Sequence, residues 1–164
     1  MITHTKTPVN IVTNSLEIAR LFEHDILLNV LLLGGDPAQG LYEVTGKRTC
    51  ANIEGLRGDI TFPEVHDVDL EEGITMPYSS EAELISVMMK RCRKKIVLAD
   101  HSKFGRVSLY RIGCSFGDVG MIITDGGIDG KFVAEFRERG VEVVVAGSPP
   151  PAYTETVGGT SRHV

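Results

Sequence analysis

The stretch KKIVLADHSKFG, residues 94–105, combines an apolar strand with a polar corner. Residues 96–99 are apolar on consecutive positions, which is typical of a strand buried on both faces of a parallel sheet. Four polar residues follow at once, and packing explains them poorly: Asp100, His101, Ser102 and Lys103. Ligands of open parallel α/β sheets bind beyond the carboxyl ends of the strands. The stretch therefore predicts a parallel sheet with a ligand site at this corner.

Strand and helix patterns alternate on both sides of this stretch. Strands are predicted at 9–13, 25–33, 59–65, 95–99, 107–112, 119–124 and 141–147. Helices are predicted at 14–24, 47–56, 79–94 and 130–140. Residues 66–79 are predicted to form a polar loop, and the tail 148–164 to be disordered. The alternation predicts a single α/β domain over residues 1–147, with a mostly parallel sheet flanked by helices.

Three local expectations follow from residue types. Asn14 is predicted to be the N-cap of the first helix, with Glu17 in the capping-box position. Ser80 and Glu83 are expected to form a capping box at the start of the third helix. The apolar run at 25–33 is expected to be covered on both faces, as in a parallel sheet.

The composition limits the possible functions. Hydrophobic residues make up 42% of the 164 and charged residues 24%, as in an ordinary soluble globular protein. The net charge of −5 argues against a broad electrostatic hold on nucleic acid or on an anionic membrane. Three widely spaced cysteines show no metal-ligand spacing, so we expect reduced thiols and neither metal nor cofactor. No apolar run is long enough to span a bilayer and no signal peptide is visible, which predicts a cytoplasmic protein.

Polar residues follow five of the predicted strands, and parallel strands would bring them to one edge. They are Thr13-Asn14-Ser15, Gly34-Gly35-Asp36, His66-Asp67, Asp100 to Lys103, and Thr124-Asp125. Hydroxyls and amides at a helix start, with a lysine nearby, suit a phosphate. Asp100 and Asp125 suit sugar hydroxyls, or could act as acid and base. Taken singly, the first group is better explained as a helix cap, the glycines as a turn and His66 as a loop histidine.

Six motifs, in this order and spacing, resemble the C-terminal sensor domain of DeoR-family bacterial transcriptional regulators. They are IVTNS (11–15), LLLGGD (31–36), EEGIT (71–75), SEAEL (80–84), ADHSKFG (99–105) and MIITD (121–125). The resemblance covers about residues 9–145. It implies a fold related to that of ribose-5-phosphate isomerases and CoA transferases. It also implies an effector-binding module for a phosphorylated sugar or sugar derivative, without turnover.

The resemblance assigns residues to the ligand site, and implies a role for some of them. Lys103 and the helix start at Thr13, Asn14 and Ser15 are expected to contact the phosphate, and Asp100 to orient a sugar hydroxyl. The other positions that match the family pattern are His66, Thr75, Glu81 and Asp125. One departure concerns the middle loop, where the family pattern has glycines on both sides of the histidine. Here Glu64 and Asp67 take those places and add bulk and negative charge.

The resemblance also predicts an N-terminally truncated regulator. A first strand–loop–helix unit and a DNA-binding helix-turn-helix precede this region in the family, so we expect no direct DNA binding by this chain alone. We expect it to pair with a second copy of itself. Two alternatives stay open: a sugar-phosphate isomerase-like enzyme using Asp100 or Asp125, and a remnant that binds nothing or serves only in oligomerisation. No GxSxG or HExxH motif supports other catalysis.

Overall fold

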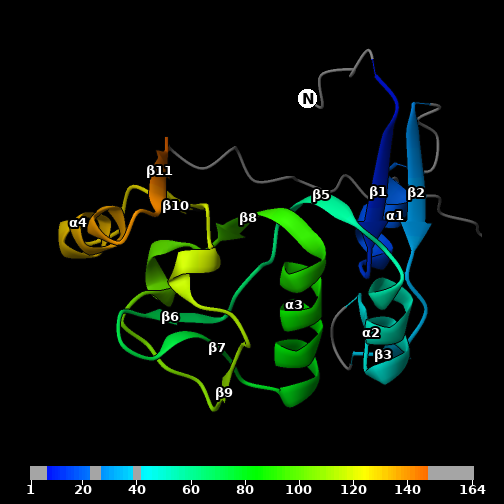
Figure 1. The fold of residues 1–164 in the computed structure, drawn as a ribbon, viewed down its shortest axis with the longest axis horizontal. Helices are drawn as coiled ribbons and strands as arrows, with labels where there is room; N and C mark the ends of the chain where they lie inside the picture. The colour runs from blue at the N-terminus through cyan, green and yellow to red at the C-terminus, as the bar shows by residue number, and fades with distance from the viewer. Residues whose placement is uncertain (1–6, 23–26, 39–41, 148–164) are drawn as a thin grey trace, which may run out of the picture.

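The computed structural model describes residues 7–22, 27–38 and 42–147. Its centre is a four-stranded sheet in the order β11-β10-β8-β5, in which all neighbouring strands are parallel (Figure 1). The strands are β5 (Gly58–Thr61), β8 (Cys92–Leu98), β10 (Met121–Asp125) and β11 (Glu142–Ala146). The predicted α/β fold with a mostly parallel sheet is confirmed. The carboxyl ends of β8 and β10 carry Asp100 and Asp125.

Two helices flank this sheet and bury their apolar faces. In α3 (Ser79–Arg91) the buried residues are Ala82, Leu84, Ile85 and Met89. In α4 (Gly130–Glu138) they are Phe132 and Phe136. Phe136 is fully buried, and its ring centre lies 5.0 Å from that of Phe116 and 6.0 Å from that of Phe104. Phe104 directly follows the polar corner, so aromatic packing holds the corner against the core.

A small antiparallel sheet lies beside the corner and corrects two expectations. It contains β6 (Asp67–Asp69), β7 (Gly73–Met76) and β9 (Tyr110–Arg111). The prediction of a loop over 66–79 was wrong, and the strand predicted at 107–112 is only two residues long. The Asp69 carboxylate accepts hydrogen bonds from the amides of Glu71 and Glu72, so the acidic run forms the turn between β6 and β7. Strands this short are not revealed by hydrophobic periodicity.

The N-terminal strands form a separate two-stranded parallel sheet. β1 (Val9–Thr13) pairs with β2 (Leu28–Leu32), next to α1 (Leu16–Leu21), on the far side of α3 from β10 and β11 (Figure 1). The prediction that five strand ends share one edge was therefore wrong. The expectation that β2 is covered on both faces was also wrong, because Leu31 is 47% exposed. An apolar pattern identifies a strand, but it does not identify the strand's neighbours.

A second, smaller core joins this unit to the rest of the molecule. It consists of Leu33 after β2, Cys50 and Ile53 of α2 (Lys47–Glu54), and Leu84 of α3. The helix predicted at 47–56 is thus observed, two residues shorter. A hairpin of β3 (Asp36–Pro37) and β4 (Val44–Thr45) leads into it.

The helix starts differ from the predicted caps. Ser15, not Asn14, caps α1, and its hydroxyl accepts a hydrogen bond from the Ile18 amide at 3.3 Å. Tyr78 precedes α3 and gives no side-chain cap, so the expected Ser80–Glu83 capping box was wrong. The predicted disordered tail at 148–164 lies outside the described residues. Within the described ranges, no helix combines the length and apolarity needed to cross a membrane.

Candidate functional site

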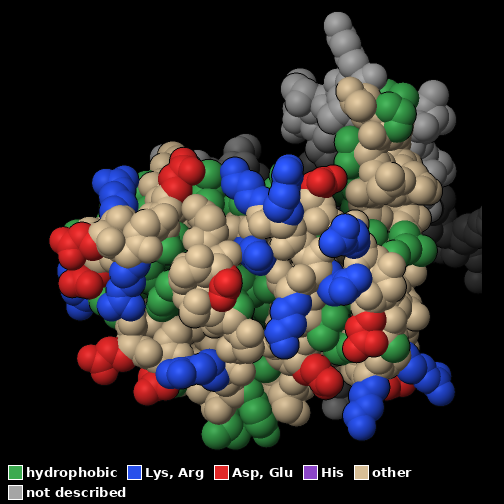
Figure 2. Space-filling view, viewed as in Figure 1, with side chains coloured by type: hydrophobic (Ala, Val, Ile, Leu, Met, Phe, Trp, Pro, Cys, Tyr) green, Lys and Arg blue, Asp and Glu red, His purple; other side chains and the backbone are tan. Residues whose placement is uncertain are grey.

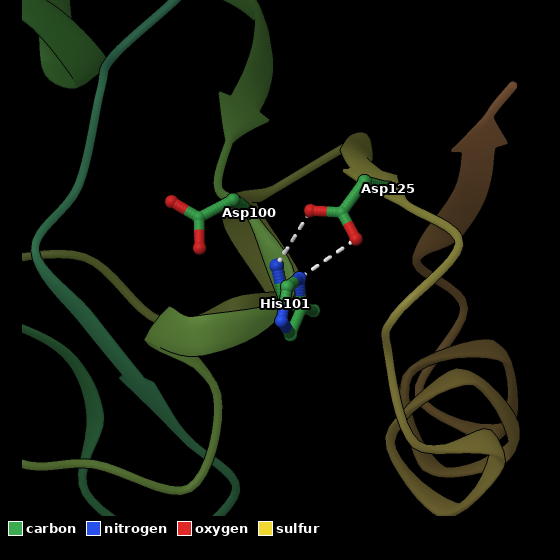
Figure 3. Close-up of side chains that lie close together, drawn as sticks. All are labelled: Asp100, His101 and Asp125. Atoms are coloured by element: carbon green, nitrogen blue, oxygen red, sulfur yellow. Dashed lines mark hydrogen bonds and ion pairs between the residues drawn. The ribbon is translucent and has the colours of Figure 1, made fainter. Parts of the chain in front are cut away.

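The polar corner after β8 is a compact hydrogen-bonded unit. A short 3-10 helix, η1 (His101–Lys103), follows Asp100, whose carboxylate accepts a hydrogen bond from the Ser102 amide at 2.8 Å. Asp125, at the end of β10, accepts one from the His101 amide at 2.9 Å and lies 2.8 Å from His101 Nδ1 (Figure 3). The structure thus brings Asp100 and Asp125 together, as their positions at the ends of neighbouring parallel strands predict.

Both carboxylates are held in the anionic form. The hydrogen bonds from Ser102 lower the pKa of Asp100, and the nearby Lys103 ammonium lowers it further. The amides of His101 and Gly127 lower the pKa of Asp125. Two anionic carboxylates at a strand end can accept hydrogen bonds from ligand hydroxyl groups.

A divalent cation is the other ligand type that this arrangement could hold. One ligand atom from each of Asp100, His101 and Asp125 lies within 4.8 Å of the others. However, the Asp125 oxygens already accept bonds from the His101 and Gly127 amides, and Asp100 Oδ1 accepts one from Ser102. A cation would have to compete with these bonds.

Lys103 supplies a positive charge without a counter-ion at contact distance. Its side chain is half-buried, and no acidic group in the described part of the chain forms a salt bridge with its ammonium. Its amide donates to the Asp100 carbonyl at 3.1 Å, which fixes the backbone of the corner. An ammonium group near the Asp100 carboxylate would suit a ligand that carries both an anionic group and hydroxyls.

A second cluster surrounds Asp67, the residue that follows His66. Asp67 is 3% exposed. Its carboxylate accepts a hydrogen bond from the Ser108 hydroxyl and lies 3.1 Å from His66 Nδ1. Arg106 Nε lies 3.3 Å from its other oxygen. Sequence reasoning missed Arg106 and Ser108, although both follow Lys103 within a few residues.

Glu81 and Asn14 both lie near Glu43. Burial and the negative charge of Glu43 raise the pKa of Glu81, and the nearby His66 opposes that shift. The Asn14 side chain donates to Glu43 Oε2 at 3.3 Å. Thr75 Oγ1 accepts a hydrogen bond from the Ser108 amide at 2.8 Å. Asn14 thus contacts Glu43, and His66 and Thr75 both lie within hydrogen-bonding distance of Ser108. The sequence pointed to neither Glu43 nor Ser108.

Thr13 and Ser15 use their side chains within the chain. Both are buried, and Thr13 Oγ1 accepts a hydrogen bond from the Ser15 amide at 3.0 Å. The Ser15 hydroxyl caps α1. These contacts support a structural role, in which the two side chains stabilise the start of α1.

Two surface cavities lie away from both clusters. One, of about 590 Å³, is lined by residues 70–73, residues 111–118 and Arg139. The other, of about 430 Å³, is lined mainly by basic residues where α3 meets β8, and Lys and Arg side chains gather over this face (Figure 2). Within the described chain, neither lining includes a residue predicted to bind ligand. The sheet edge, in contrast, brings the Asp100 and Asp125 carboxylates together and places the Lys103 ammonium near Asp100.

Comparison with known proteins decides the family. Residues 1–126 match the family described as the DeoR C terminal sensor domain. The chain belongs to this family. Relatives include the HTH-type transcriptional regulator GlpR of Haloferax volcanii, 32% identical over 81% of this chain and 51% of the relative. A candidate aga operon transcriptional repressor of Escherichia coli O157:H7 is 30% identical over 86% of this chain and 52% of the relative. The HTH-type transcriptional regulator GolR of Listeria innocua is 27% identical over 87% of this chain and 56% of the relative.

The DeoR sensor chain spans about half the length of the curated relatives it matches. The three relatives are named as regulators or repressors of transcription, and none of the three is named as an enzyme. These names agree with the prediction that the chain is the sensor module of a transcriptional regulator.

Proposed function

We propose that this domain binds a small phosphorylated sugar or sugar derivative and that this binding controls transcription. The observation that carries the proposal is the half-buried Lys103, which has no salt-bridge partner among the described acidic groups and lies close enough to Asp100 to lower its pKa. The phosphate would pair with the Lys103 ammonium, and the Asp100 and Asp125 carboxylates would accept hydrogen bonds from sugar hydroxyls. The name of one relative, the glycerol-3-phosphate regulon repressor of Haemophilus influenzae, 24% identical, mentions a phosphorylated polyol.

His66, Thr75, Glu81 and Asn14 would form the neighbouring wall of the site. The contacts of Asn14 with Glu43, of Thr75 with Ser108 and of His66 with Asp67 support this assignment, because they join separate segments of the chain. We assign Thr13 and Ser15 to the same wall through the helix start that they stabilise.

The proposal is tested by titrating the chain with ribose 5-phosphate, glycerol 3-phosphate and inorganic phosphate, using calorimetry and thermal shift. We expect Lys103→Ala to weaken binding at least about tenfold, because one charge-assisted contact is lost. Lys94→Ala is the matched control, since Lys94 is exposed on β8 and the change in net charge is the same. Undiminished affinity in Lys103→Ala would refute the assignment.

We further propose that the domain, over residues 1–147, pairs with a second copy and acts in the cytoplasm, where a bacterial regulator meets DNA. DNA itself would be contacted by a helix-turn-helix outside this sequence. Exposed apolar side chains of the N-terminal unit, among them Val12, Leu16, Leu21 and Leu31, support self-association. Light scattering coupled to size-exclusion chromatography measures the mass directly, and a monomer at micromolar concentration would refute the pairing.

A further inference from the structure

Three groups suited to binding an anion converge on a carboxylate of the chain itself. Ser108 Oγ donates to Asp67 Oδ2, and His66 Nδ1 lies 3.1 Å from the same oxygen. Arg106 Nε lies 3.3 Å from Oδ1. A hydroxyl, an imidazole and a guanidinium are groups with which proteins bind phosphate and carboxylate ligands. We call His66, Arg106 and Ser108 the donor set.

The backbone holds the donor set around Asp67. The Gly105 amide donates to the Val68 carbonyl at 2.8 Å, and the Ser108 amide donates to Thr75 Oγ1 at 2.8 Å. These two bonds fix the segment between Lys103 and β9 against β6 and β7. The donor set also reaches the surface, because the side chain of His66 is 43% exposed and that of Arg106 is 63% exposed. A dissolved anion could therefore reach these donors if Asp67 did not occupy them.

We infer that Asp67 determines ligand specificity: its carboxylate occupies the oxyanion position of the donor set and excludes a ligand's phosphate from it. The side chain of Asp67 is only 4% exposed, so an incoming phosphate would face a negative charge that is weakly screened by water. The ligand then presents an uncharged hydroxyl or amino part to this wall and carries its phosphate at Lys103. Of these statements, only the placement of the phosphate at Lys103 rests on the proposed function.

The test is an NMR titration of isotope-labelled protein with inorganic phosphate. In the unaltered chain we expect the Ser108 amide signal to stay in place while the Lys103 amide shifts. In Asp67→Gly, which empties the oxyanion position, we expect the Ser108 amide to shift and phosphate to bind there at least about tenfold more tightly, the effect of one charge-assisted hydrogen bond. Adding Arg106→Ala to this variant should remove the gain.

Two further variants keep the result interpretable. Asp67→Asn removes the charge but keeps the volume of the side chain. It should also increase the affinity for phosphate at Ser108, but by less than Asp67→Gly does. Asp69→Asn removes the same charge from the same strand, and its Ser108 signal should behave as in the unaltered chain. A shift of the Ser108 amide signal when phosphate is added to the unaltered chain overturns the inference, and this titration decides it even if the variants fold poorly. If Lys103 does not respond but Asp67→Gly gains phosphate at Ser108, the proposed function fails and the inference stands.

Discussion

Replacing Ser108 with alanine removes the hydroxyl that donates to the buried Asp67 carboxylate. The backbone of Ser108 keeps its own bond, because its amide still donates to Thr75 Oγ1 at 2.8 Å. A hydrogen bond to a charged group contributes about 1.5–3 kcal/mol. We therefore expect Ser108→Ala to lower the free energy of unfolding by about 2 kcal/mol at neutral pH.

The cost of this substitution depends on pH in a defined direction. Burial by itself raises the pKa of Asp67, but the hydrogen bonds from Ser108 and His66 and the charges of His66 and Arg106 lower it below its ordinary 3.8. Because the folded-state pKa is lower than the unfolded one, the ionised carboxylate stabilises the fold above pH 3.8, and this stability is lost as the pH falls through the folded pKa. Without the Ser108 hydroxyl the folded pKa rises. The decrease in the free energy of unfolding caused by Ser108→Ala is therefore largest at neutral pH and becomes smaller as the pH falls.

Urea unfolding followed by far-UV circular dichroism measures this cost, since the chain contains no tryptophan. Ser115→Ala is the matched control, because the Ser115 hydroxyl donates to the exposed Asp118 carboxylate at 2.9 Å, where water can replace the lost bond. We expect the control to cost clearly less at pH 7. Equal costs for the two substitutions, or a Ser108→Ala cost that is unchanged in acid, would show that the Asp67 cluster does not have the assigned electrostatic role.

Two further predictions concern the core and the thiols. Phe136→Ala should lower the free energy of unfolding by about 3–5 kcal/mol, because the ring is fully buried among other rings. Phe62→Ala, at a side chain 55% exposed, should cost much less in the same urea experiment, and similar costs would contradict the packing described. Burial raises the pKa of Cys114 to about 11. Its alkylation by iodoacetamide at pH 8 should be at least tenfold slower in the native than in the urea-unfolded chain, roughly following the thiolate fraction; equal rates by peptide mass spectrometry would contradict the burial.

The sequence predicted the elements whose own residues specify them. The strands before Asp100 and Asp125 contain uninterrupted apolar runs, the helices that bury Met89 and Phe136 contain a helical apolar pattern, and each of these elements is observed. The convergence of Asp100 and Asp125 was also predictable, because parallel neighbouring strands end at the same edge.

Pairing between distant segments was not predictable in this way. The strands β1 and β2 have clear strand patterns, yet they form a sheet of their own, so Thr13 and Ser15 do not lie at the same sheet edge as Asp100. The short antiparallel strands β6, β7 and β9 depend on partners far away in the chain, and without them no local pattern distinguishes them from loop.

The sequence by itself thus determined the α/β fold class, the family and the corner at Asp100 and Lys103, because local periodicity and residue order specify these. Only the tertiary structure decided that Asp67 is enclosed by His66, Arg106 and Ser108. A sequence shows that a carboxylate is present, but its energetic role depends on burial and on the donors around it. Two of those donors, Arg106 and Ser108, come from a segment about forty residues further along, which lies beside Asp67 because β7 pairs with both β6 and β9.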